Sequence, residues 1–273
     1  MKNPSKLILA ALLSGSVAQA ANTIFEANFE SGLAANTGTI TYNAGYNVQV
    51  AVTGGPDATL GSNVLFADPT TGSAAATDIT LTPTVGASLT GGQTAVVSFD
   101  FAIRRTYGDN KSHYVTGYDS SNTIIFQFVL GELNEFGNGA TDRQRPGYAT
   151  NTGAFSFAGE IVSGATPGSY WFGNDAEGDG FNSSKDAHFD LTIGASGWSV
   201  FTTKADGVTT AQTTTLATYD GGTFTDLAYV TVTGESAAAG GFFDNLTIVA
   251  VPEPSSAALL GLGGLALLRR RRK

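Results

Sequence analysis

Short stretches in which apolar and polar residues alternate constrain the fold of this chain more than any other feature. In residues 97–103, Phe99 and Phe101 are flanked by polar or small residues, and residues 123–130 and 189–193 repeat the pattern. A period of two is that of a β-strand with one face buried and the other in water. Further candidate strands are residues 24–29, 39–42, 48–52, 78–81, 198–200, 229–233 and 242–249.

The spacing of these strands predicts a single β-domain. The runs follow one another at intervals of roughly ten residues, and Gly-, Pro-, Asp- and Asn-containing turns separate them. No linker or internal repeat divides residues 21–250, and the chain has no cysteine, so its stability has to come from a hydrophobic core. We expect an all-β fold, a two-sheet jelly-roll sandwich, flanked by an N-terminal signal peptide and a short C-terminal hydrophobic helix.

The first 20 residues have the parts of a secretory signal peptide. Lys2 and Lys6 supply the positive charge that precedes a short apolar stretch. Ala18 and Ala20 then form an A-x-A cleavage site. We therefore expect signal peptidase to remove residues 1–20 and the remaining chain to be exported.

The C-terminal residues 251–273 combine three further parts. Pro252, Glu253 and Pro254 form a segment that both prolines hold extended. The apolar run that follows, residues 257–268, is short against the roughly 20 residues that span a bilayer, so a transmembrane helix here would be strained or transient. The basic residues that would stop transfer on the cytoplasmic side are Arg269, Arg270, Arg271, Arg272 and Lys273.

This order of a Pro-Glu-Pro motif, an apolar segment and a basic block resembles the PEP-CTERM sorting signal of diderm bacteria. The resemblance implies recognition by an exosortase, a membrane enzyme that cleaves at or near Pro-Glu-Pro. It also implies a transient membrane anchor and a final place at the cell surface or in the extracellular matrix, where such proteins often accompany exopolysaccharide. Proteins with many unrelated domains carry this signal, so the signal does not indicate what residues 21–250 do.

Charge excludes one class of partner. The whole chain has 14 Lys and Arg against 23 Asp and Glu. The leader carries two lysines and the tail carries five basic residues and Glu253, which leaves seven basic and 22 acidic residues in the body, a net charge of about −15. Nucleic acid is not an expected partner, because binding phosphates needs a basic patch.

Parts of the body resemble known β-sandwiches. Residues 188–193 and 197–200, joined by a tight turn, are similar to the paired strands of laminin-G and concanavalin-like jelly rolls. Residues 25–30 and 242–248 are similar to their opening and closing strands, which a galactose-binding-like jelly roll shares. The resemblance implies contact with carbohydrate or matrix only by analogy of fold.

One acidic loop has the spacing of a calcium site. Residues 175–186 carry oxygen donors at positions one, three, five and twelve and a glycine at position six, and they resemble EF-hand and dockerin loops. The candidate ligands are Asp175, Glu177, Asp179, Phe181 through its carbonyl, and Asp186. The flanking residues look like strands instead of helices, so a polar hairpin without an ion explains the loop as well as Ca²⁺ does. No other cofactor is expected.

Aromatic residues just before that loop are candidate glycan contacts. Tyr170 and Trp171 stand beside Asn174 and Asp175, so a sugar ring could stack on the aromatic faces while the polar side chains bind its hydroxyls. The alternative is that these aromatics fill the core.

Catalysis has little support in the sequence. His113 and His188 lie in predicted strands without a metal-ligand partner at short spacing, and no G-x-S-x-G motif occurs. We therefore expect that the protein is not an enzyme and that it is an exported structural or interaction protein. The alternatives are a carbohydrate-binding module for exopolysaccharide and, with less support, a glycan-active enzyme.

Overall fold

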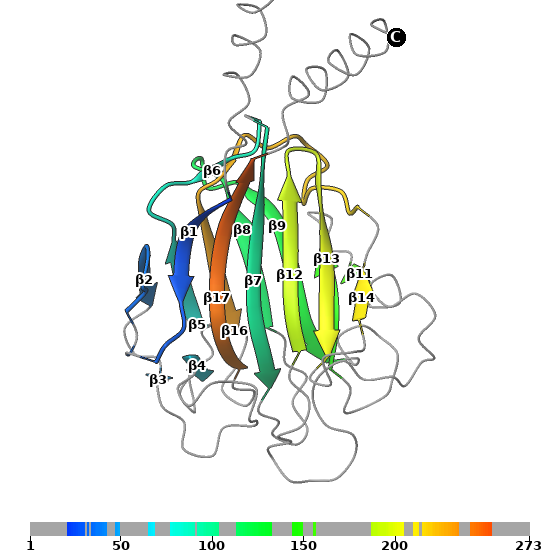
Figure 1. The fold of residues 1–273 in the computed structure, drawn as a ribbon. Helices are drawn as coiled ribbons and strands as arrows, with labels where there is room; N and C mark the ends of the chain where they lie inside the picture. The colour runs from blue at the N-terminus through cyan, green and yellow to red at the C-terminus, as the bar shows by residue number, and fades with distance from the viewer. Residues whose placement is uncertain are drawn as a thin grey trace, which may run out of the picture.

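The protein is described by a computed structural model. It covers residues 21–30, 32, 34–42, 47–49, 65–68, 77–90, 92–103, 113–132, 144–149, 155–156, 187–204, 210–212, 215–234 and 241–252. Two large antiparallel sheets pack face to face in this part of the chain (Figure 1). The predicted all-β sandwich is confirmed.

The eight-stranded sheet, called sheet A, combines strands from the beginning, the middle and the end of the described chain. Its order is β14 (Thr210–Gln212), β13 (Gly197–Lys204), β12 (Ala187–Gly194), β7 (Gln93–Ile103), β17 (Gly241–Pro252), β4 (Leu65–Asp68) and β3 (Asn47–Gln49). The eighth strand, β1 (Asn22–Ala27), also pairs with β17. The first and last strands of the sandwich are therefore neighbours, as the jelly-roll resemblance implies.

The seven-stranded sheet, called sheet B, lies behind sheet A in Figure 1. Its order is β11 (Phe155–Ser156), β10 (Gln144–Ala149), β9 (Ile124–Glu132), β8 (His113–Tyr118), β16 (Tyr229–Gly234), β5 (Thr77–Thr82) and β2 (Thr39–Tyr42). A short pair, β6 (Ala87–Ser88) and β15 (Asp226–Leu227), lies at one end of the sandwich.

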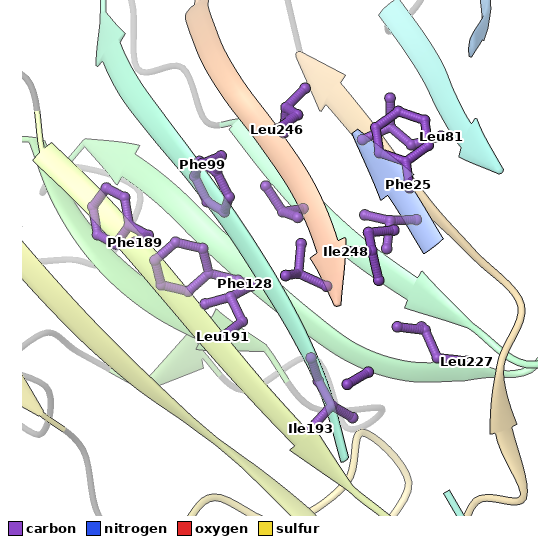
Figure 2. Packing of buried hydrophobic residues seen from close by; sticks show 14 of the residues in the cluster. Phe25, Leu81, Phe99, Phe128, Phe189, Leu191, Ile193, Leu227, Leu246 and Ile248 are labelled. Atoms are coloured by element: carbon purple, nitrogen blue, oxygen red, sulfur yellow. The ribbon is translucent and has the colours of Figure 1, made fainter. Parts of the chain in front are cut away.

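Alternating side chains of both sheets fill the space between them. Phe99 of sheet A stacks on Phe189 of the same sheet with ring centroids 5.4 Å apart, and Phe128 of sheet B packs against both rings (Figure 2). The largest side chains that are almost fully buried are Phe25, Phe29, Phe99, Phe101, Phe126, Phe128, Phe189 and Phe243. Rings of this size bury enough apolar area to carry a sandwich without disulfides.

Two bulges change the simple alternation that the sequence predicts. In β9 both Ile125 and Phe126 are buried, because the pairing of β8 with β9 shifts by one residue after Gly117. In β17 the register with β7 shifts between Asp244 and Thr247, where Asn245 has a φ of 49°. An extra residue in one strand reverses which neighbours face the core, so Phe243 and Leu246 both point inward.

Strand β17 is held along both of its edges. It pairs with β7 along one edge, and β4 and β1 share the other. Its pairing continues to Val251 and Pro252, two residues beyond the boundary expected from the sequence. Asn22 of β1 lies opposite Ala250, so the described body begins and ends at the same end of the sandwich (Figure 1).

Within the described ranges no helix has the length and apolar character needed to cross a bilayer. The predicted signal peptide, residues 1–20, and the predicted apolar segment, residues 257–268, lie outside those ranges and stay predictions.

Candidate functional site

Pro252 alone among the predicted site residues lies in the described part of the chain. It ends β17 opposite Gln93, in the extended conformation that the Pro-Glu-Pro motif predicts. Proline cannot donate an amide hydrogen bond to a β-ladder, and it is tolerated here because the ladder ends at this residue. The residues that lie outside the described ranges are Ala18, Ala20, Tyr170, Trp171, Asp175, Glu177, Asp179, Phe181, Asp186, Glu253, Pro254, Arg269, Arg270, Arg271, Arg272 and Lys273.

A group of polar side chains crosses the outer face of sheet A. We call it the Asp–His cluster; it consists of Ser98 and Asp100 on β7, His188 and Asp190 on β12, and Asn245 on β17. These residues occupy the outward positions of strands whose inward positions carry the phenylalanine core, so the alternation that builds the core also assembles the cluster.

His188 is the centre of this cluster. Its Nδ1–H donates to Asp100 Oδ1 at 2.7 Å and its Nε2–H donates to Asp190 Oδ1 at 3.2 Å. The hydrogen bond to Asp100, then the one to Asp190, raises the pKa of His188 from 6.5 to about 10, against the lowering effect of burial. The imidazole is therefore a cation at neutral pH.

The carboxylates have further partners. Ser98 Oγ donates to Asp190 Oδ1 at 2.5 Å, and Asn245 Nδ2 donates to Asp100 Oδ2 at 2.7 Å. The hydrogen bond from His188 is the main cause that lowers the pKa of Asp190, and Ser98 adds to it, while burial opposes it. Asn245 reaches Asp100 from the bulge of β17, where asparagine tolerates the left-handed backbone better than most residues.

An exposed aromatic ring borders the cluster. Phe201 on β13 lies directly opposite Asp190 in the register of β12 with β13, and it is 38% exposed. The other large apolar side chain that is exposed in the described ranges is Val85, at 68%. Phe201 thus places an apolar surface in water beside two charged hydrogen-bonding groups.

This arrangement suits binding better than proton transfer. A carboxyl group that acts as a general acid has to keep its proton near neutral pH, whereas Asp190 is ionised there because its pKa is lowered. His188 keeps its proton until about pH 10, so it is not a base at neutral pH. No group of three or more His, Cys, Asp or Glu side chains that could hold a metal is found in the described ranges.

The other candidate aromatic surface lies on sheet B. Tyr118 and Tyr229 stack with centroids 4.7 Å apart and ring planes 10° apart, and Tyr229 Oη–H donates to Asn122 Oδ1 at 3.1 Å. Burial is the main cause that raises the pKa of Tyr229. The two rings stack, so each covers one face of the other, and both side chains are half-buried whereas Phe201 is exposed.

Trp198 and His113 both belong to the core. Trp198 is 2% exposed, packs against Phe126, and donates from Nε1 to the carbonyl of Ala217 at 3.0 Å. His113 is buried against the rings of Phe101 and Phe243.

The comparison with protein families identifies the C-terminal segment. Residues 250–273 match the PEP-CTERM protein-sorting motif, which confirms the resemblance seen in the sequence. The motif implies an exported protein that is transiently anchored in the membrane and processed by an exosortase. It covers the tail alone, so it says nothing of what the sandwich does. No curated protein matches the sequence.

Solved structures similar to the body show its fold. The carbohydrate esterase of the Shiga toxin-encoding bacteriophage phi24B aligns with a TM-score of 0.52 and 10% identity, over 85% of this chain and 100% of the esterase. Peanut lectin aligns with a TM-score of 0.50 and 10% identity, over 84% of this chain and 97% of the lectin. The body therefore has the fold of a jelly-roll sandwich, and at this identity the likeness concerns the fold alone.

Proposed function

We propose that this protein is a non-catalytic interaction protein of the cell surface or its extracellular matrix, delivered there by export and exosortase processing. The observation that carries the proposal is that the sorting motif, which starts at residue 250, begins inside β17. Because β7, β1 and β4 flank that strand, any enzyme or membrane that holds the tail also holds the folded sandwich.

The charge state of the Asp–His cluster supports a role without catalysis. Ser98 and His188 both donate to Asp190, and His188 and Asn245 both donate to Asp100. A cluster whose charged groups are hydrogen-bonded to one another presents fixed polar groups, and neither Asp190 nor His188 is a free acid or base at neutral pH. We expect no release of reducing ends when the protein is incubated with a panel of polysaccharides.

Mass spectrometry of the C-terminus in the native host tests the delivery step. We expect the mature chain in the surface fraction to start at Ala21 and to end at or just beyond Pro252, without residues 257–273. Glu253→Ala should leave the tail attached and the protein in the membrane fraction, whereas the control Ser256→Ala should be processed like the natural chain. A surface protein that keeps its whole tail would overturn the proposal.

Carbohydrate binding is the second candidate function. The exposed ring of Phe201 beside Asp190 favours it, because aromatic surface next to fixed hydrogen-bonding groups is the usual chemistry of sugar recognition. The fold is compatible with this role, since a lectin and a carbohydrate esterase are built on similar sandwiches. The partner would be the exopolysaccharide of the matrix into which the protein is sorted.

A further inference from the structure

We infer that the outer face of sheet A is a binding site for a neutral polysaccharide, with Phe201 as the stacking surface and the Asp–His cluster as the hydrogen-bonding surface. The inference rests on the proposed function, because it names the ligand that the sorted protein would hold at the cell surface. It places the glycan site on β7, β12, β13 and β17, and not at Tyr170 and Trp171.

The register aligns these groups in two rows across four strands. One row runs from Phe201 through Asp190 and Ser98 to Thr247. The neighbouring row runs from Thr203 through His188 to Asp100, which Asn245 reaches from β17. Adjacent strands are about 4.8 Å apart, so the first row, which crosses four strands, extends roughly 14 Å, and the second row, from Thr203 to Asp100 across three strands, extends roughly 10 Å. Both rows are long enough for more than one sugar unit.

Each row offers what a sugar needs. One face of a hexose is lined by C–H groups that pack on an aromatic ring, and its edge carries hydroxyls that donate to carboxylates. A carboxylate has acceptor capacity for about four hydrogen bonds, and the contacts described for Asp100 and Asp190 use two on each. Their side chains are 21% and 33% exposed, so the remaining capacity is reachable from water.

The cluster is fixed before a ligand arrives. His188 bridges both carboxylates, and Ser98 and Asn245 hold them from neighbouring strands. Groups that are already ordered lose little conformational entropy on binding, which favours affinity for a weakly interacting ligand such as a sugar. Phe201 is 38% exposed, so part of its ring can be reached from water for stacking.

Charge selects among polysaccharides. The two carboxylates and the His188 cation leave the cluster with a net charge of about −1, and the body carries about −15. Polysaccharides rich in uronate or sulfate would be repelled by this field. The structure therefore points to a neutral chain, not to a polyanion.

Affinity electrophoresis tests the site. Residues 21–252, which contain all the described strands, are run through gels that contain a soluble glucan, a galactan, a mannan, an alginate or the host's own exopolysaccharide. We expect retardation by at least one neutral polysaccharide and none by alginate. Phe201→Ala should weaken binding about tenfold, which corresponds to ~1.4 kcal/mol, and Phe201→Trp should preserve or strengthen it.

Two controls separate binding from folding and sorting. Val85→Ala removes the other large apolar side chain that is exposed in the described ranges and should leave retardation unchanged. If no neutral polysaccharide retards the protein, or if Phe201→Ala binds as well as the natural chain, the inference is wrong. If glycan binding fails but the C-terminus is processed normally in the host, only the glycan-site inference is wrong. If C-terminal processing itself fails, the proposed function is wrong.

Discussion

Replacing His188 by glutamine removes the charge that joins the two carboxylates of the outer face. Glutamine keeps hydrogen-bonding capacity at the position but carries no positive charge. Asp100 and Asp190 would then lie close to one another without a cation between them. We expect His188→Gln to lower the free energy of unfolding by about 1–2 kcal/mol near pH 6.

The structure sets this magnitude. A rise of the His188 pKa from 6.5 to about 10 would be equivalent to about 5 kcal/mol if the site were dry, at ~1.4 kcal/mol for each tenfold change in proton affinity. However, the His188 side chain is 39% exposed, and solvent screens its interactions. Exposed ion pairs usually contribute up to ~1 kcal/mol, and two charge-assisted hydrogen bonds raise this to about 1–2 kcal/mol.

The loss of stability should depend on pH in a defined way. The folded pKa of His188 lies above its ordinary value, so its contribution is complete below pH 6.5 and disappears as the pH rises through about 10. The folded pKa of Asp190 lies below 3.8, so its contribution is complete above that pH and disappears as the pH falls below it. The difference between the natural chain and His188→Gln should therefore be largest between about pH 4 and 6.5.

Urea unfolding of residues 21–252, followed by the fluorescence of their two tryptophans, Trp171 and the buried Trp198, measures this difference at pH 6 and pH 10.5. Thr192→Ala, on the same strand and face, is the matched control and should change stability by less than about 0.5 kcal/mol. Taking the difference between variants cancels the titration of other groups. A deficit that is equal at pH 6 and pH 10.5, or absent at both, would refute the assignment of His188 as a cation.

Three other changes test the core, the glycine in it and the acidic loop. Gly117→Ala should cost about 1–3 kcal/mol in chemical denaturation, because its Cβ would lie 2.2 Å from Phe126 Cε1, and adding Phe126→Leu should recover part of that loss. Trp198→Ala should cost about 3–5 kcal/mol, since it empties a buried site and removes the donor to Ala217; a loss under 1 kcal/mol would show that Trp198 is not in the core. If residues 175–186 hold Ca²⁺, the melting temperature of residues 21–252 should rise with Ca²⁺ and the rise should vanish in Asp179→Asn, whereas an unchanged melting temperature rejects the ion.

The strands were predictable because their inward positions are strongly apolar. Residues 97–103 and 189–193 lie in β7 and β12 as expected, and their phenylalanines form the centre of the core. The sequence also predicted the turn between β12 and β13, since a glycine stands on each side of it. These are local signals, and a period of two determines them without knowledge of any partner strand.

The Asp–His cluster was not predictable in the same way. Asp100 and His188 are separated by 88 positions, and their contact depends on β12 pairing with β7 in one particular register. Asn245 joins them only because a bulge changes the direction of β17. The available signal was the alternation of inward and outward positions, since the polar residues at 98, 100, 188 and 190 all alternate with core positions. This alternation places the residues on an outer face, but it does not show which strands pair with one another or in which register.

The position of the sorting motif has a physical consequence for its processing. A cleaving enzyme needs an extended peptide that it can surround, yet Val251 and Pro252 are still paired with Thr94 and Gln93 of β7. The Pro252–Glu253 bond is therefore the first one beyond the described sheet. Pro252 donates no amide hydrogen bond, and terminal strand pairs open at little cost, so releasing these two residues would give an enzyme access while Ala250 and Ile248 stay in the core. The end of β17 can thus serve both as the last part of the sandwich and as the approach to the cleavage site.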